Sequence, residues 1–161
     1  MESDVLRIGQ GYDIHRLVEG RPLRLGCVTV ESERGALGHS DGDAAAHAIC
    51  DALLGAAALG DLGTFFPSSD ARWRNADSTV FLAHVARLLG EAAATIVNVD
   101  VTIVIERPRI APHIDAMRAA VAAALGVDFT RISVKAKSGD SIGAIGAWQA
   151  VEAHAIALID L

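Results

Sequence analysis

The chain has 161 residues, a formal net charge of −6 at pH 7 and a sequence pI near 5.4. This length predicts a single domain over residues 1–161, and the acidic balance argues against a nucleic-acid partner bound through a basic surface. No stretch approaches the ~18 consecutive apolar residues of a membrane helix, and Met1-Glu2-Ser3-Asp4 lacks the basic start of a signal peptide, so we expect a cytoplasmic protein without membrane contact.

The hydrophobic pattern predicts strands and helices that follow one another along the whole chain. In chain order they are a strand over residues 6–9 that leads toward residue 15, a strand over 23–30, a polar connection over 31–38, a helix over 41–59, a loop over 67–70, a helix from about 78 to 90, a strand over 99–105, a helix from 114 to 126, and strands over 132–136 and 150–161. This order predicts an α+β fold (an α/β sandwich), in which helices cover one face of a mixed β-sheet. Because the hydrophobic fraction of 52% is high for so small a chain, we expect the other sheet face to pack against another subunit.

Three residues predict a metal site. Asp13 and His15 are two residues apart, so both side chains project from the same face of an extended segment, and His47 follows in an apolar, alanine-rich run. Catalytic zinc sites offer three protein ligands and keep a fourth position open. The alternative is that the three are unrelated polar residues on loops, or that His47 is a core histidine with its hydrogen bonds satisfied.

A second cluster surrounds the start of the predicted helix over residues 41–59. Ser40 and Asp43 have the spacing of a capping box, which makes Ser40 the predicted cap. On a helix, His39, Asp43 and His47 would share one face, because they are four residues apart. The pattern therefore predicts a phosphate at His39 and Ser40, bound at the helix N-terminus, and predicts that Asp43 orients an imidazole.

The chain resembles the 2-C-methyl-D-erythritol 2,4-cyclodiphosphate synthase family in five segments. They are G-Y-D-I-H at residues 11–15, H-S-D-G-D-A-A-A-H-A at 39–48, D-A-L-L-G-A-A-A-L-G-D-L-G at 51–63, F-P-S-S-D at 66–70 and N-V-D-V-T-I at 98–103. The resemblance implies a homotrimer with active sites between adjacent subunits. It also implies conversion of 4-diphosphocytidyl-2-C-methyl-D-erythritol 2-phosphate, a cytidine diphosphate-linked substrate, into the cyclic diphosphate and CMP in non-mevalonate isoprenoid synthesis.

The resemblance also implies roles for single residues. Zinc, or another divalent transition metal, would bind Asp13, His15 and His47, and Mg²⁺ or Mn²⁺ would bind Asp140. His39 and Ser138 would be catalytic. The implied substrate-binding residues are Asp13, His15, His39, Ser40, Asp61, Leu62, Gly63, Phe66, Asp70, Pro108, Arg109, Ile110, Ala136, Lys137 and Ser138.

These residues would divide between two subunits. His39 and Ser40 would position the 2-phosphate, residues 61–63 would hold hydroxyls of the erythritol, and the loop over residues 66–70 would close over the substrate. Residues 105–111 and 136–138 of the neighbouring subunit would form the cytidine pocket.

The chain departs from the family over residues 134–150, where members usually read V-K-A-T-T-T-E-K-L-G-F-T-G-R-G-E-G. Ser138 and Asp140 stand where the family has a Thr and a Glu, so the hydroxyl and the carboxylate are kept. Lys137 stands for a Thr, and either contacts a phosphate or is a solvated surface charge. Ala144 and Ala147 replace a Phe and an Arg, and that Arg lines the anion-binding end of the trimer cavity in members that bind isoprenoid diphosphates. We therefore do not expect such binding here.

Two other functions compete with the cyclisation. One is a metal-dependent phosphoesterase that uses zinc-bound water, and the other is a trimeric binding module that kept the fold without turnover. The remaining chemically interesting side chains are predicted to be structural; they are His84, His113, His154, Trp73 and Trp148.

Overall fold

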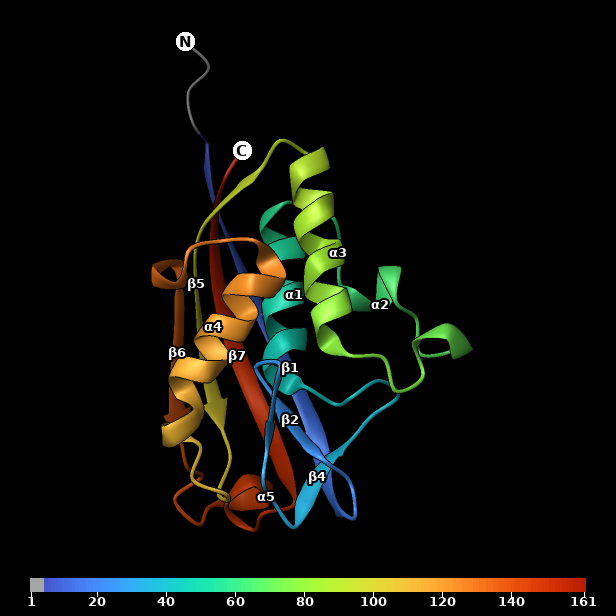
Figure 1. Cartoon of the computed structure of the whole chain (residues 1–161), viewed down its shortest axis with the longest axis vertical. Helices are drawn as coiled ribbons and strands as arrows, with labels where there is room; N and C mark the ends of the chain where they lie inside the picture. Colours follow the sequence, from blue (N-terminus) through green and yellow to red (C-terminus); the bar gives the residue numbers. More distant parts are fainter. Residues whose placement is uncertain (1–4) are drawn as a thin grey trace.

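A five-stranded mixed β-sheet forms one layer of the protein, and helices form the other (Figure 1). The structure is a computed structural model that describes residues 5–161; the four residues on which the expectation of no signal peptide rests lie outside this range. The strands are β1 (Leu6–Glu19), β2 (Leu23–Leu25), β3 (Val28–Val30), β4 (Arg34–Leu37), β5 (Thr95–Val104), β6 (Ile132–Lys137) and β7 (Ala150–Asp160). The helices are α1 (Ala44–Ala56), α2 (Leu62–Phe65), α3 (Ser78–Glu91), α4 (Ile114–Leu125) and α5 (Gly143–Gly146), with 3-10 turns at Ala71–Trp73, Ala111–His113 and Phe129–Arg131.

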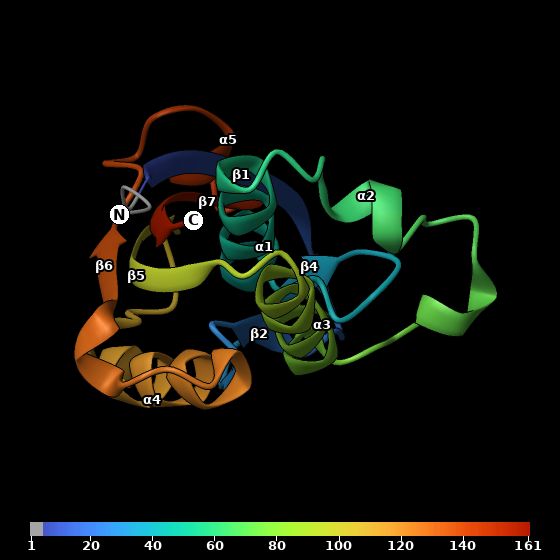
Figure 2. The same ribbon diagram turned by 90° about the horizontal axis from the view of Figure 1, so that it is seen from above.

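The sheet has the strand order β4-β1-β7-β5-β6. Only β5 and β6 pair in parallel; the other neighbours are antiparallel. Helix α1 lies on β1 and β7, α3 packs on the outside of α1, and α4 covers β6 (Figure 2). The predicted α+β fold with helices on one sheet face is therefore confirmed. In the part of the chain that the structure describes, no helix has the length and apolar character to cross a bilayer.

Several predicted boundaries are wrong for tertiary reasons. Residues 23–30 form not one strand but the hairpin of β2 and β3, because Gly26 and Cys27 turn the chain with φ values of 56° and 63°. The predicted connection over residues 31–38 contains β4, which is a strand because it pairs with the far end of β1. Strand β5 begins four residues before the predicted start, at Thr95.

The predicted helix over residues 41–59 is shorter and is capped by a different residue. Helix α1 begins at Ala44, and the carboxylate of Asp43 accepts the N–H of Ala46 as its N-cap. Ser40 is therefore not the cap, and His39 lies outside the helix, so His39, Asp43 and His47 do not share a helix face. Asp43 wins the cap position because its carboxylate also accepts the backbone N–H groups of Gly26 and Cys27, a tertiary contact that local spacing cannot reveal.

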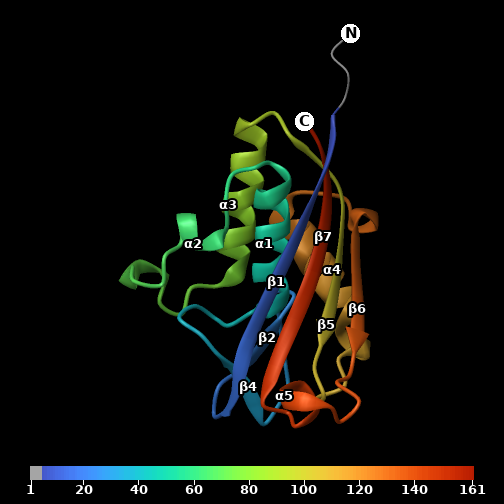
Figure 3. The same cartoon turned by 180° about the vertical axis from the view of Figure 1, so that it is seen from behind.

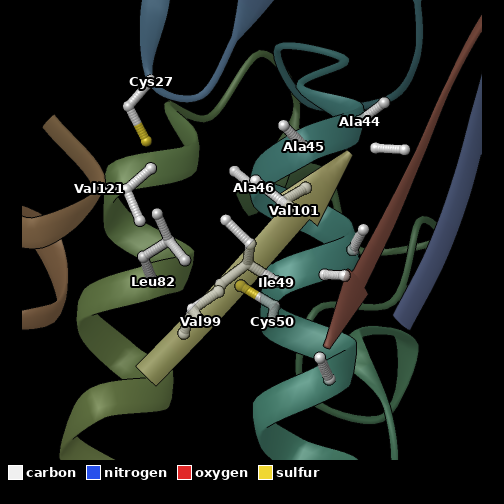
Figure 4. Close-up of a cluster of buried hydrophobic side chains, with 14 of the residues drawn as sticks. Cys27, Ala44, Ala45, Ala46, Ile49, Cys50, Leu82, Val99, Val101 and Val121 are labelled. Atoms are coloured by element: carbon white, nitrogen blue, oxygen red, sulfur yellow. The ribbon is translucent and has the colours of Figure 1, made fainter. Parts of the chain in front are cut away.

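The hydrophobic core lies between the sheet and the helices. Figure 4 shows side chains from the β2–β3 turn, α1, α3, α4 and β5 converging in this layer, among them Cys27, Ile49, Leu82, Val99 and Val121. Both cysteines are buried and free, and burial raises the pKa of each thiol, so they act as small apolar residues.

Along most of its length no helix of the described residues covers the opposite face of the sheet; only the short helix α5 lies at its lower end (Figure 3). Large apolar side chains remain 42–70% exposed on β1 and β7; they are Leu6, Ile8, Tyr12, Ile14 and Ile156. They alternate along β1 with residues that face α1, as the period of a strand requires. This is the uncovered apolar face that the composition predicts.

Helix α1 approaches β1 very closely at two glycines. A Cβ built on Gly11 would lie 1.8 Å from the carbonyl oxygen of Ala48, and one on Gly9 would lie 1.9 Å from that of Ala52. Both distances are far inside van der Waals contact, so the helix can pack here only against glycine. Asp13 and His15 follow on the same strand face, directly beside the helix.

We expect Gly11→Ala to lower the free energy of unfolding by about 1–3 kcal/mol, because the added methyl group forces α1 away from the sheet. Gly55→Ala is the matched control: Gly55 lies in α1 with no atom within 4 Å of an added Cβ, so this change should raise stability by about 0.5–1 kcal/mol. Urea denaturation measures both. A Gly11→Ala protein as stable as wild type would contradict the close approach.

Candidate active site

The three predicted metal ligands come together. Asp13 and His15 project from β1, and His47 projects from the first turn of α1. Oδ2 of Asp13 lies 3.0 Å from Nδ1 of His47 and 3.1 Å from Nδ1 of His15. One ligand atom from each residue lies within 4.8 Å of the others, and among residues 5–161 this is the only such group of three or more His, Cys, Asp or Glu side chains. The alternative of unrelated polar residues is therefore wrong.

The donor set fits a divalent transition metal. Two imidazole nitrogens and one carboxylate oxygen are zinc ligands of the kind that leaves a fourth position open for a substrate. Nδ1 of His15 is buried and, although close to Asp13, makes no hydrogen bond of acceptable geometry. A buried polar atom without a partner is costly, and a shared metal ion would satisfy it.

Burial and proximity shift the ionisation of this cluster in opposite directions. Burial raises the pKa of Asp13, but the neighbouring imidazoles of His15 and His47 lower it by more, so the net pKa lies below its ordinary value. Burial lowers the pKa of His47, but Asp13 raises it by more, so the net pKa lies above its ordinary value. The pair therefore favours a carboxylate beside a protonated imidazole when no metal competes for them.

The second nitrogen of His47 faces two hydroxyl groups. Nε2 lies 3.2 Å from Oγ of Ser40 and 3.4 Å from Oγ of Ser78. The prediction that Asp43 orients an imidazole is wrong, because its carboxylate is occupied by backbone N–H groups and caps α1. Ser40 and Ser78, and not Asp43, lie against the imidazole of His47.

A pocket of about 270 Å³ opens beside the triad. Seven predicted site residues line it: His15, His39, Ser40, His47, Leu62, Gly63 and Phe66. Its other lining residues are Ser68, Trp73 and Phe81, and Trp73 packs edge-on against Phe66 with ring centroids 4.8 Å apart. The short helix α2 and the turn after it, which carry part of this wall, project from the body of the protein (Figures 1 and 2).

Two predicted residues near this pocket have structural partners instead of facing it. The carboxylate of Asp61 caps α2 by accepting from the backbone and side chain of Thr64. Asp70 pairs with Arg72 through its carboxylate, and its carbonyl oxygen lies 2.9 Å from Nε2 of His39. Neither Asp61 nor Asp70 lines the pocket.

A second pocket, of about 300 Å³, collects the residues predicted to hold cytidine. It is lined by Ile105, Glu106, Pro108, Arg109, Ile110, Ala111, Ala136, Lys137 and Ser138. The carboxylate of Glu106 accepts the backbone N–H of Gly139 at 2.9 Å and so joins the two loops. Asp140, the predicted magnesium ligand, is exposed on the same loop as Ser138 but does not line the pocket.

The two pockets share no lining residue. His15 and His47 of the triad line the first pocket, with Asp13 beside them, and Ser138 lines the second. The chain therefore presents two separate pockets, and neither pocket contains every residue that the sequence predicts for the reaction.

Of the side chains predicted to be structural, only Trp73 lines one of these two pockets. His84 packs beside Phe66, His154 is exposed on the open sheet face next to Tyr12, and His113 lies at the start of α4. Trp148 donates its indole N–H to the carbonyl oxygen of Arg107. Sequence reasoning missed Ser78 as a neighbour of His47. In the sequence, Ser78 follows Asp77 at the start of a predicted helix, and nothing in that position indicates the contact with His47.

An α+β domain with a candidate three-ligand metal site beside a pocket is typical of an enzyme. The comparison with known proteins gives the particular family: the chain belongs to the YgbB family, whose profile matches residues 6–160. A curated relative from Burkholderia cenocepacia (strain HI2424), a 2-C-methyl-D-erythritol 2,4-cyclodiphosphate synthase, is 54% identical over 153 residues, which cover 95% of each chain.

Solved structures agree with this assignment. The CDP-bound form of a 2C-methyl-D-erythritol-2,4-cyclodiphosphate synthase is 41% identical, with a TM-score of 0.87, and covers 96% of this chain and 100% of that chain. The CDP complex of IspF from Plasmodium falciparum is 34% identical, with a TM-score of 0.85, and covers 99% of this chain and 98% of that chain. The resemblance that the sequence motifs predict is confirmed.

The raised pKa of His47 predicts the pH dependence of metal binding. The proton stays on this imidazole above its ordinary pKa of about 6.5 and must leave before the nitrogen binds a metal. As the pH is lowered, the affinity of the metal-free protein for zinc should therefore begin to fall while the pH is still above 6.5. The expected loss is about tenfold per pH unit for each displaced proton. Chelator competition measures this, and His84→Gln should leave the profile unchanged. An affinity that stays constant through this range would contradict the shift.

Proposed function

We propose that this chain, as a single domain over residues 1–161, is a phosphorus–oxygen lyase that converts 4-diphosphocytidyl-2-C-methyl-D-erythritol 2-phosphate into 2-C-methyl-D-erythritol 2,4-cyclodiphosphate and CMP in isoprenoid-precursor synthesis. The observation that carries the proposal is the convergence of Asp13, His15 and His47 in a chain that matches a synthase of this name over 95% of its length. The proposed location is the cytoplasm.

The reaction needs no protein nucleophile. An oxygen of the 2-phosphate attacks the β-phosphorus of the diphosphate, the bond from that phosphorus to the CMP oxygen breaks, and CMP leaves with the electron pair. Such transfers depend on alignment of the reacting groups and on neutralisation of the phosphate oxygens. The chain has a net charge of −6, so bound cations have to supply much of this neutralisation.

Zinc held by Asp13, His15 and His47, and Mg²⁺ or Mn²⁺ held by Asp140 and the substrate, would withdraw charge from the phosphate oxygens when bound. Asp140 is a suitable partner for a hard cation, because Mg²⁺ is usually held by one or two carboxylates together with substrate phosphates. His39 and Ser40, on the wall of the first pocket, would position the 2-phosphate. Ser138 would donate a hydrogen bond from its hydroxyl to an oxygen of the transferring phosphate.

The cytidine would occupy the second pocket. Its lining includes Pro108, Arg109, Ile110, Ala136 and Lys137, which offer apolar surface for the base and positive charge near the phosphates. The erythritol would lie between the triad and residues 61–63, with Phe66 against it and Asp70 at the loop end.

A homotrimer with active sites between subunits completes the proposal. It is supported by the separation of the two pockets within one chain and by the apolar sheet face that no helix of the described residues covers. Burial of this face between subunits removes exposed leucine, isoleucine and tyrosine side chains from water.

Product analysis tests the reaction. Purified protein supplied with zinc, magnesium and the cytidyl substrate should release CMP and form the cyclic diphosphate in equal amounts, as followed by phosphorus NMR. Release of inorganic phosphate would favour a phosphoesterase that uses metal-bound water. Failure to release CMP from protein that binds zinc would favour a binding module without turnover.

Mixed trimers test the division of the site between subunits. His47→Ala should abolish zinc binding and turnover, and Asp140→Asn should abolish turnover with zinc retained. When the two inactive variants are co-expressed, each mixed ring of three should contain one site built from an intact metal half and an intact loop half, so activity should return to roughly a quarter of wild type for random assembly. The two variants mixed as separately folded, non-exchanging trimers provide the control. Co-expression without recovery would contradict a site shared between subunits.

A further inference from the structure

We propose that Ser78 and Asp41 are positioning residues that hold the imidazole of His47 in the tautomer that binds the metal. The inference rests on the zinc site of the proposed function, but not on turnover. Nδ1 of His47 faces the carboxylate of Asp13, which can only accept and by itself favours hydrogen on Nδ1, so a hydrogen on Nε2 needs an acceptor of its own. That nitrogen lies 3.4 Å from Oγ of Ser78 and 3.2 Å from Oγ of Ser40.

Asp41 is surrounded by donors. Its carboxylate accepts the backbone N–H of Ser78 at 2.7 Å, the hydroxyl of Ser78 at 2.5 Å and the backbone N–H of Asp43 at 3.1 Å. Arg24 adds positive charge, with Nε 3.7 Å from Oδ2. Asp41 therefore acts as an acceptor in every one of these contacts, which fixes the single hydroxyl hydrogen of Ser78 on its carboxylate.

This arrangement determines the proton on His47. Because the hydroxyl of Ser78 donates its hydrogen bond to Asp41, only the lone pairs of its oxygen remain for the imidazole. Nε2 must then carry a hydrogen and donate a hydrogen bond to Ser78. When the hydrogen that Nδ1 shares with Asp13 leaves, the lone pair of Nδ1 is available in the direction of Asp13 and His15. That is the nitrogen that the metal needs, and hydrogen bonds of this kind usually orient metal-binding histidines.

Ser40 cannot fix the tautomer in the same way. It lines the first pocket, where a bound phosphate would compete for its hydroxyl, whereas Ser78 is fully buried at the first residue of α3 and does not line that pocket. The network therefore connects the start of α3 to a predicted metal ligand on α1, through groups that do not line the first pocket.

Zinc affinity without substrate tests this inference. We expect Ser78→Ala to weaken zinc binding by about tenfold or more in chelator competition, since loss of an outer hydrogen-bond partner costs about 10–100-fold in metal affinity. The Co²⁺-loaded protein should also show an altered visible absorption band. Thr79→Ala is the matched control: it removes a hydroxyl from the next residue, which bonds to Asp77 and not to His47, and should change affinity less than about twofold.

Asp41→Asn provides the second variant, in case the cavity left by Ser78→Ala prevents folding. The amide can donate a hydrogen to Ser78, which frees the serine hydroxyl to donate to Nε2 and favours the wrong tautomer, so zinc affinity should fall here too. Unchanged affinity and an unchanged Co²⁺ spectrum in a folded variant, or an equal loss in Thr79→Ala, would overturn the inference. Absence of CMP release with these affinity changes present would count against the proposed reaction alone.

Discussion

The candidate metal site depends on how closely helix α1 lies against strand β1. The carbonyl oxygen of Ala48 occupies the space that a side chain on Gly11 would need. At this separation His47 reaches Asp13, with 3.0 Å between Nδ1 and Oδ2, although the two residues belong to different layers of the fold. A larger side chain on this strand face would move the helix outward and separate ligand atoms that now lie within 4.8 Å. The abundance of alanine and glycine in these segments therefore sets the geometry of the site as well as the packing of the core.

The elements that could be predicted from the sequence are those whose signal is local. Helices α3 and α4 and strand β5 have long apolar stripes or alternation, so their existence and type follow from periodicity alone. Strand β4 has four residues and no such pattern; it is a strand because β1 extends to Glu19 and supplies its hydrogen-bond partners. The predicted cap of α1 is wrong for the same reason. Ser40 and Asp43 are both good caps locally, and the choice between them is made by two N–H groups from a distant turn.

The motif H-S-D-G-D shows how adjacent polar residues acquire different roles. Asp43 is fully buried and satisfied by backbone donors, so it holds the β2–β3 turn on the start of α1. Asp41 instead receives both polar groups of Ser78, a partner 37 residues away in the sequence. The metal triad was predictable, because two ligands alternate on one strand and the third lies in a helix. Ser78 was not, because its contact with His47 exists only after α3 packs on α1.

The half of the site that differs most from its family has a backbone with little freedom. Gly139 stands where members usually have threonine, and a Cβ there would lie 2.6 Å from the backbone nitrogen of Gly146. Asp140 and Ser141 follow with φ values of 51° and 60°, a left-handed turn that packs this loop against α5. The loop therefore cannot move outward easily to make up for the shorter side chain of Asp140. Under the proposed function, a cation bound by this carboxylate would lie nearer the loop than one bound by glutamate, and the substrate phosphates would have to reach it there.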